Sequence, residues 1–179
     1  MPMLYSLDLE RRILALLIKK PSVYAEISRL VEAEDFYHKS GSTGTNAHRS
    51  IFEMIMILMK DGHDEQISSV ILIERLKASG LTFVDDLKVE SYINNSLGMM
   101  KVPDSSEGAI ALAKELRNYR GRRDYLDTLE SLKNSISSGP LLPIPDLVNK
   151  VDSGLSSILS THGEGSEETL ALFEDPMAR

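Results

Sequence analysis

The chain has 179 residues, 42% of them apolar, which is enough for one hydrophobic core with an extension. It lacks Cys and Trp, which excludes disulfides and thiolate metal sites and, with few aromatics overall, favours packed helices over a sheet sandwich. The net charge of −7 argues against non-specific nucleic-acid binding as the main role, because that binding requires cations that neutralise phosphates.

Apolar residues at helical spacing predict five helices in the first part of the chain. We expect them from Ser6 or Asp8 to Leu17, from Pro21 to Val31, from Asn46 to Lys60, from Ser68 or Ser69 through Leu76, and from Val89 to Leu97. Gly62 and Gly80 stand where the third and fourth would end. The four apolar residues Val70–Ile73 could also form a strand, but the continuation to Leu76 favours a helix.

After Pro103 the pattern changes to two long helices. Asp104 and Glu107 have the form of a capping box, with Asp104 as the cap, and the helix that follows runs to about Ser137. Gly121 lies within it as a kink or packing point. A Pro-rich turn leads to a second amphipathic helix, whose apolar face contains Ile144, Leu147, Val148, Val151, Leu155, Ile158 and Leu159.

Two amphipathic helices joined by a short turn form an αα-hairpin, which usually leaves apolar surface for a partner. We interpret it as an association device; the alternative is that it folds back on its own globular body. The predicted fold is all-α, with a globular helical domain at 1–103, a helical hairpin at 104–162 and an acidic linker at 163–179. The apolar cluster Leu170–Phe173 within that linker is typical of a segment that docks on another surface.

No catalytic constellation follows from the residue pattern. The four histidines, His38, His48, His63 and His162, lack the spacing of a zinc site, and G-x-x-x-x-G-K-[ST] is absent. We interpret His48 as a helix-start residue bonded to its neighbours. Adjacent acids such as Glu34 and Asp35 are explained by capping. No apolar run approaches ~18 residues and no secretion signal is present, so we expect neither a membrane span nor export.

The dense basic group consists of Arg117, Arg120, Arg122 and Arg123. On a helix these side chains spread over more than one face, with Asp124 and Asp127 close enough to pair with some of them. A solvated, ion-paired surface is one interpretation. The other is a contact to DNA phosphate or to an acidic partner, although few aromatics are interleaved for base stacking.

Two segments carry a family resemblance. Leu30 to Tyr37 reads LVEAEDFY, and His48 to Glu53 reads HRSIFE. Together they resemble the signature of the N-terminal domain of DnaB-type replicative DNA helicases from bacteria and their phages. The signature residues are Phe36, Tyr37, His48, Arg49, Ile51 and Phe52. The opening Asp8 to Leu17 is similar to the family's first helix, but Lys20 replaces the usual Asp before Pro21.

Three departures accompany this resemblance. Ser40–Asn46 is an insertion, and Asp86–Lys88 replaces a Gly-Gly turn. The chain also has no Walker motif and no arginine finger. A divergent, phage-encoded member would explain the first two, and a chain cut in the inter-domain linker would explain the third.

The resemblance implies a helical globule whose hairpin pairs two subunits, with three such dimers forming a collar on a hexameric helicase ring in DNA replication. The collar would dock the C-terminal domain of primase and meet a helicase loader, with little direct DNA contact, in the cytoplasm. ATP and Mg would belong to the absent motor domain. Pairing would rest on Ile144, Leu147, Val151, Leu155 and Ile158. The alternative is a stand-alone helical regulator that binds a host helicase or primase.

Overall fold

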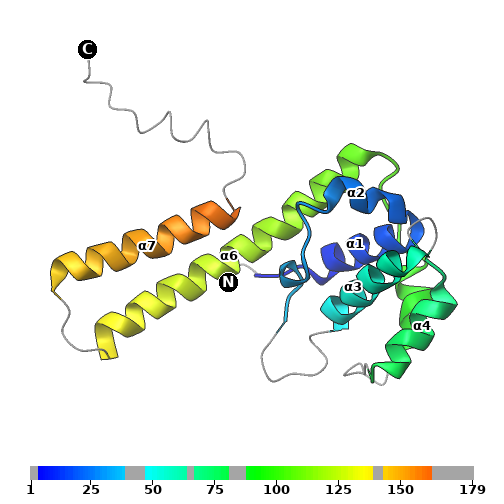
Figure 1. The fold of residues 1–179 in the computed structure, drawn as a ribbon, viewed down its shortest axis with the longest axis horizontal. Helices are drawn as coiled ribbons and strands as arrows, with labels where there is room; N and C mark the ends of the chain where they lie inside the picture. Colours follow the sequence, from blue (N-terminus) through cyan, green and yellow to red (C-terminus); the bar gives the residue numbers. More distant parts are fainter. Residues whose placement is uncertain (1–3, 39–46, 64–66, 81–87, 139–142, 163–179) are drawn as a thin grey trace, which may run out of the picture. The chain divides into compact units, whose positions relative to one another are not determined.

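A computed structural model describes residues 4–38, 47–63, 67–80, 88–138 and 143–162 (Figure 1). Throughout these ranges the regular structure is helical and no strand occurs, which confirms the all-α prediction. The chain forms two compact units, residues 1–120 and residues 121–179, and one long helix contributes to both. The insertion Ser40–Asn46, the Asp86–Leu87 turn and the acidic linker with its Leu170–Phe173 cluster lie outside the described residues.

Helix α1 (Leu7–Lys19) is the centre of the first unit. Its cap is Ser6, whose Oγ accepts a hydrogen bond from the amide of Leu9 at 3.3 Å. An unbroken apolar run from Ile13 to Leu17 is fully buried, so the helix is covered on most of its circumference at this level. α1 packs against α3 (Ala47–Leu58) and against the last short helix of the unit.

The second predicted helix is wrong in length. The chain instead forms a 3-10 turn η1 (Pro21–Val23), a single α-turn α2 (Tyr24–Ile27) and a second 3-10 turn η2 (Ala33–Asp35). α2 ends at Ile27, and the amides of Leu30 and Val31 close the turn that follows by donating to the Ile27 carbonyl. Glu32 then takes an extended conformation (φ −126°, ψ 166°) and forms a reciprocal capping box with Asp35, which starts η2. Local side-chain bonds of this kind compete with helix continuation.

The next helices follow the sequence pattern closely. α3 continues into a π-helical turn η3 (Met59–His63), and Gly62, with φ 93°, kinks the chain inside this turn. α4 (Ser69–Ala78) confirms the helical interpretation of Val70–Ile73 and is followed by Gly80 at φ 75°. Both glycines adopt the left-handed conformation that side-chain-bearing residues rarely take. The predicted fifth helix is present as a short α5 (Val89–Ser91) that passes into a π-helical segment η4 (Tyr92–Leu97).

One hydrophobic core holds the first unit together. It draws apolar side chains from α1, α3, α4, η4 and the start of the long helix α6 (Ser106–Ser138). Burial of these side chains is the main stabilisation of the folded unit and contributes about 1.5–3 kcal/mol for each large apolar side chain. The fully buried members include Ile13, Leu14, Ile27, Phe36, Ile51, Ile55, Leu72, Leu76 and Ile93.

Helix α6 begins with a cap different from the one expected. Ser105, not Asp104, accepts a hydrogen bond at its Oγ from the amide of Gly108 at 3.2 Å. Asp104 instead pairs with Lys20 at 3.0 Å, which takes its carboxylate away from the helix end. The backbone amide of Glu107 and the Ser105 hydroxyl lower the pKa of the Glu107 carboxyl. In the second unit, the rest of α6 and α7 (Ile144–His162) form the predicted hairpin.

Candidate functional site

A chain of buried polar side chains joins three segments of the first unit. Glu10 of α1, which is 1% exposed, accepts the backbone N–H of Tyr37 at 2.8 Å on one oxygen. Its second oxygen lies 2.5 Å from Nδ1 of His48 at the start of α3. The other ring nitrogen of His48 contacts the hydroxyl of Tyr92 in η4, and that hydroxyl accepts from Arg11 Nε at 3.2 Å.

These contacts can all be satisfied at once by one arrangement of protons. Burial raises the pKa of the Tyr92 hydroxyl, so this group keeps its proton and can donate to Nε2 of His48. With a proton on Nδ1, the same ring donates to Glu10. His48 is therefore a helix-start residue as expected, but its partners lie 38 and 44 residues away rather than beside it in the sequence.

The aromatic and aliphatic signature residues lie mainly in the core. Phe36 and Phe52 pack with ring centroids 4.9 Å apart, and both are buried together with Ile51. Tyr37 is half-buried and stacks on Tyr5 at 4.2 Å. This part of the signature specifies how η2, α3 and the residues just before α1 pack against one another.

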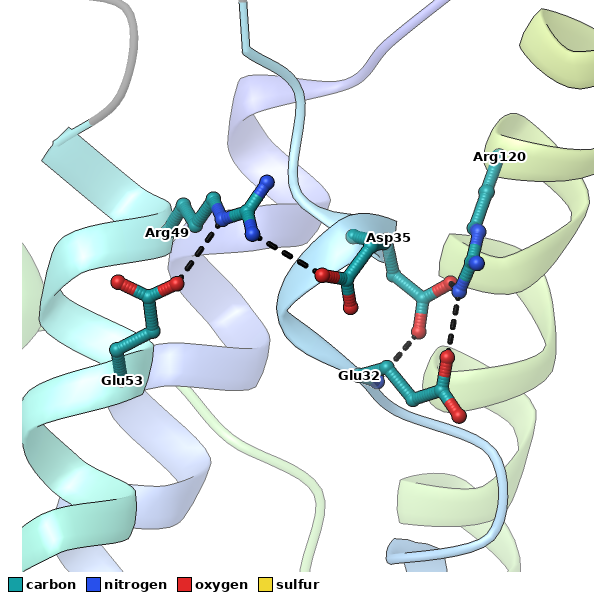
Figure 2. Close-up of polar contacts among 6 residues, drawn as sticks. Glu32, Asp35, Arg49, Glu53 and Arg120 are labelled. Carbon is teal, nitrogen blue, oxygen red and sulfur yellow. Dashed lines mark hydrogen bonds and ion pairs between the residues drawn. The ribbon is translucent and has the colours of Figure 1, made fainter.

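Two arginines bind the acidic turn η2 from opposite sides (Figure 2). Arg49 of α3 pairs with Glu34 at 3.0 Å and with Glu53 at 3.0 Å. Arg120 of α6 pairs with Glu32 at 2.7 Å and approaches Asp35 at 3.5 Å.

Asp35 is the buried member of this group, with 1% of its side chain exposed. It also accepts the backbone N–H of Glu32 at 2.6 Å. Burial raises the pKa of the Asp35 carboxyl above its ordinary value, although the Glu32 amide and Arg120 act in the opposite direction.

The basic group on α6 is partly committed to the globular unit. Arg117 donates to the backbone carbonyl of Arg29 at 2.9 Å, and Arg120 forms the ion pairs above. Both guanidinium groups therefore contact the segment from Arg29 to Asp35 of the globular unit. Pairing with the neighbouring Asp124 and Asp127 stays a prediction. Arg122 is exposed and Arg123 is half-buried. A contact of these two to DNA or to a partner stays a prediction.

Small and polar residues form contacts between the two helices of the hairpin. Gly154 of α7 lies against Thr128 of α6, where an added Cβ would come within 3.0 Å of the threonine methyl group. Lys150 donates to Ser135 at 2.8 Å. These two contacts fix α6 and α7 as antiparallel neighbours. Of the predicted interface residues Ile144 is 77% exposed. The others are half-buried: Leu147, Val151, Leu155 and Ile158.

Ile144 and five apolar residues outside the predicted interface are more exposed than the four half-buried interface residues. Each helical residue turns by about 100°, which places these residues in one stripe beside the row that faces the other helix. The turn has the same sense on both helices, and because the helices are antiparallel the two stripes share one face. We call this the hairpin face: Tyr125, Leu129, Ile136, Ile144, Val148 and Leu159, which are 44%, 43%, 61%, 77%, 51% and 65% exposed.

The sequence matches the family described as DnaB-like helicase N terminal domain over residues 2–118. This is more than half of the chain, and it includes the buried network and every signature residue. The chain belongs to this family. The matched range ends at residue 118, so most of the hairpin lies beyond it. No individual curated protein matches the chain.

The described residues hold no group of three His, Cys, Asp or Glu side chains placed to bind a metal ion. None of the helices in the described ranges has the length and apolar character needed to cross a bilayer. Sequence reasoning missed Glu10 and Tyr92 as partners of His48, because nothing in the sequence marks pairs so far apart.

Proposed function

We propose that this chain is the oligomerisation and primase-docking domain of a DnaB-type replicative DNA helicase. On this proposal it forms part of a collar in which hairpins pair two subunits and three pairs complete a hexameric ring. ATP-driven unwinding belongs to a motor domain outside this chain, as do ATP and Mg. Membership of the DnaB-like family supports the general role in replication, and the hairpin face supports pairing.

The hairpin face is the single observation that carries the pairing proposal. Six large apolar side chains lie exposed on one side of an antiparallel hairpin, although the hairpin seam itself is filled by Leu132 and the half-buried residues of α7. Contiguous apolar surface of this kind marks interaction sites. A second copy offers the same face, so a twofold arrangement would bury both at once.

The size of such an interface is adequate. A stable protein–protein interface buries on the order of 1,600 Å² in total, and two hairpins of this length laid face to face can reach that area. Two exposed cations of α6 adjoin the hairpin face: Lys133 lies between Leu129 and Ile136, and Arg122 lies one turn before Tyr125. Pairing would have to leave these two charges at the solvated edge of the interface, because burying them unpaired is costly.

The experiment is light scattering of the purified chain, alone and with the C-terminal domain of its cognate primase. We expect a dimer or a larger ring that increases in mass when primase is added. A monomer whose mass does not change with primase would contradict the collar role and leave a stand-alone helical regulator of the same fold.

A further inference from the structure

The hairpin has almost no buried core of its own. Among the described side chains from residue 121 to residue 160, one is buried, Leu132 of α6 at 9% exposed. None of the described side chains of α7 is buried to that degree. The first unit, by contrast, buries apolar side chains from several helices in one cluster. Two packed helices of this length bury too little apolar surface to be stable without further support.

The contacts between the two helices of the hairpin are small or polar. Gly154 lies against Thr128, which brings the helices close but buries little apolar surface. Lys150 donates to Ser135 at 2.8 Å, and both groups are exposed, so this hydrogen bond adds little net stability. The large apolar side chains of the hairpin face lie beside this seam and stay exposed. Contacts with α6 therefore hold α7 weakly.

The sequence of α7 also has a low intrinsic preference for the helix. Of its 19 residues, four belong to the best helix formers: Leu147, Lys150, Leu155 and Leu159. The others include Gly154, four serines and several β-branched residues, all of which favour the helix less. A helix of this length and composition is not stable alone in water, because starting the first turn is unfavourable.

The other helix of the hairpin does not share this weakness. α6 is one uninterrupted helix of 33 residues, and its first turns are packed in the core of the first unit. There Ala109, Ala113 and Leu116 are 0%, 0% and 1% exposed. Extending a helix that already exists is much easier than starting a new one. The later turns of α6 can therefore stay helical without α7, whereas α7 depends on what it packs against.

A second copy of the chain supplies what the seam lacks. The hairpin face carries three exposed apolar side chains from each helix, so an identical face matches it in extent and character. Two hairpins packed through these faces form a bundle of four helices, in which α7 has apolar neighbours from the other copy as well as from α6. Such a bundle buries apolar residues of α7 that one hairpin leaves exposed.

We propose that the folding of α7 is coupled to the pairing of two chains, an inference that rests on the proposed pairing through the hairpin face. In the single chain, α7 exchanges between a helix docked on α6 and an undocked state without the helix. Pairing shifts this equilibrium to the docked helix, because only that state presents the residues of α7 in the hairpin face. The first unit stays folded in both states, so the change is confined to α7.

The first test follows amide hydrogen exchange by mass spectrometry, in peptides from α7 and from residues 106–120 of α6. Ile136→Asp disrupts the hairpin face on α6 and leaves the sequence of α7 unchanged; Ile136 is 61% exposed. Peptides of α7 should exchange at least about tenfold faster in this variant than in the paired unmodified chain, while those of α6 keep their rates. Asn134→Asp, an exposed site outside the hairpin face, adds the same charge and is the matched control.

The second test changes the helix preference of α7 without touching the hairpin face. Ser153 is exposed on another face of α7, and Ser153→Ala favours the helix. Each pairing event folds two copies of α7, so self-association measured by sedimentation velocity should become about fivefold tighter. Ser131→Ala makes the same substitution at an exposed site of α6, which is helical before pairing, and should leave association unchanged.

The outcomes separate this inference from the pairing on which it rests. An unmodified chain that pairs, with α7 equally protected in single Ile136→Asp chains, would overturn the coupling and leave the pairing intact. Equal association of Ser153→Ala and Ser131→Ala would do the same. An unmodified chain that stays single at every concentration would contradict the pairing itself, and the coupled folding of α7 with it.

Discussion

At the scale of single residues, the signature positions of this chain act through burial and pairing. Glu10 receives two donors, the amide of Tyr37 and the ring of His48, and is closed off from solvent. A buried acceptor of this kind costs little while both donors are present and a great deal when one is lost. The network ties α1, α3 and η4 together, so its effect is on the stability of the whole first unit.

Glu10→Gln should lower the free energy of unfolding by about 1–3 kcal/mol, because the amide NH₂ then faces one of the two buried donors. Urea unfolding followed by circular dichroism at fixed protein concentration measures this. Glu26→Gln on the exposed side of α2 is the matched control and should have no effect. Equal stability of the two variants would show that the Glu10 contacts contribute nothing.

The Asp35 carboxyl gives stability a defined pH dependence. Burial raises its folded-state pKa above 3.8, so between 3.8 and the raised value the folded state binds more protons than the unfolded state. In that interval the contribution of Asp35 to stability falls as pH rises. The advantage of the unmodified chain over Asp35→Asn should therefore be smaller at about pH 7 than at about pH 4. An advantage that grows with pH in parallel urea titrations would mean that pairing with Arg120 outweighs burial.

At the scale of elements, the question is whether Ser105 or Asp104 caps the start of α6. Ser105 makes the capping hydrogen bond, whereas Asp104 is held by Lys20 at the surface.

Ser105→Ala should lower the free energy of unfolding by about 1 kcal/mol, the usual loss for a helix cap. Asp104→Ala should have a smaller effect, because it removes only an exposed ion pair. Thermal and urea unfolding of both variants check the order. The reverse order would return the capping role to Asp104.

The long, strongly periodic helices could be predicted from the sequence, and the short ones could not. α1, α3, α4, α6 and α7 follow from apolar spacing and from glycines at their ends. The prediction for the segment from Pro21 to Val31 failed because the chain turns after Ile27 and restarts as η2 with the Glu32–Asp35 capping box, and a hydrophobic pattern reveals neither feature. The partners of His48 and Arg120 were missed for a related reason, since tertiary pairs leave no periodic signal.

At the scale of the whole molecule, the proposed pairing of subunits depends on the exposed apolar residues of the hairpin. The apolar residues of α7 form a stripe wider than the surface that α6 covers. The five residues first predicted as the interface include four that are half-buried within the hairpin. A substitution there would disturb the hairpin as well as any partner. Val148 and Leu159 are better test positions, since they are 51% and 65% exposed.

The most direct test of the pairing proposal is sedimentation velocity of Val148→Asp beside Ser153→Asp, an exposed site on another face of α7. Placing a charge in the hairpin face should weaken self-association at least about tenfold, or about 1.4 kcal/mol, while Ser153→Asp leaves it unchanged. Circular dichroism establishes that both variants remain folded. Association of Val148→Asp at the strength of the unmodified chain would show that the hairpin face is not the pairing surface.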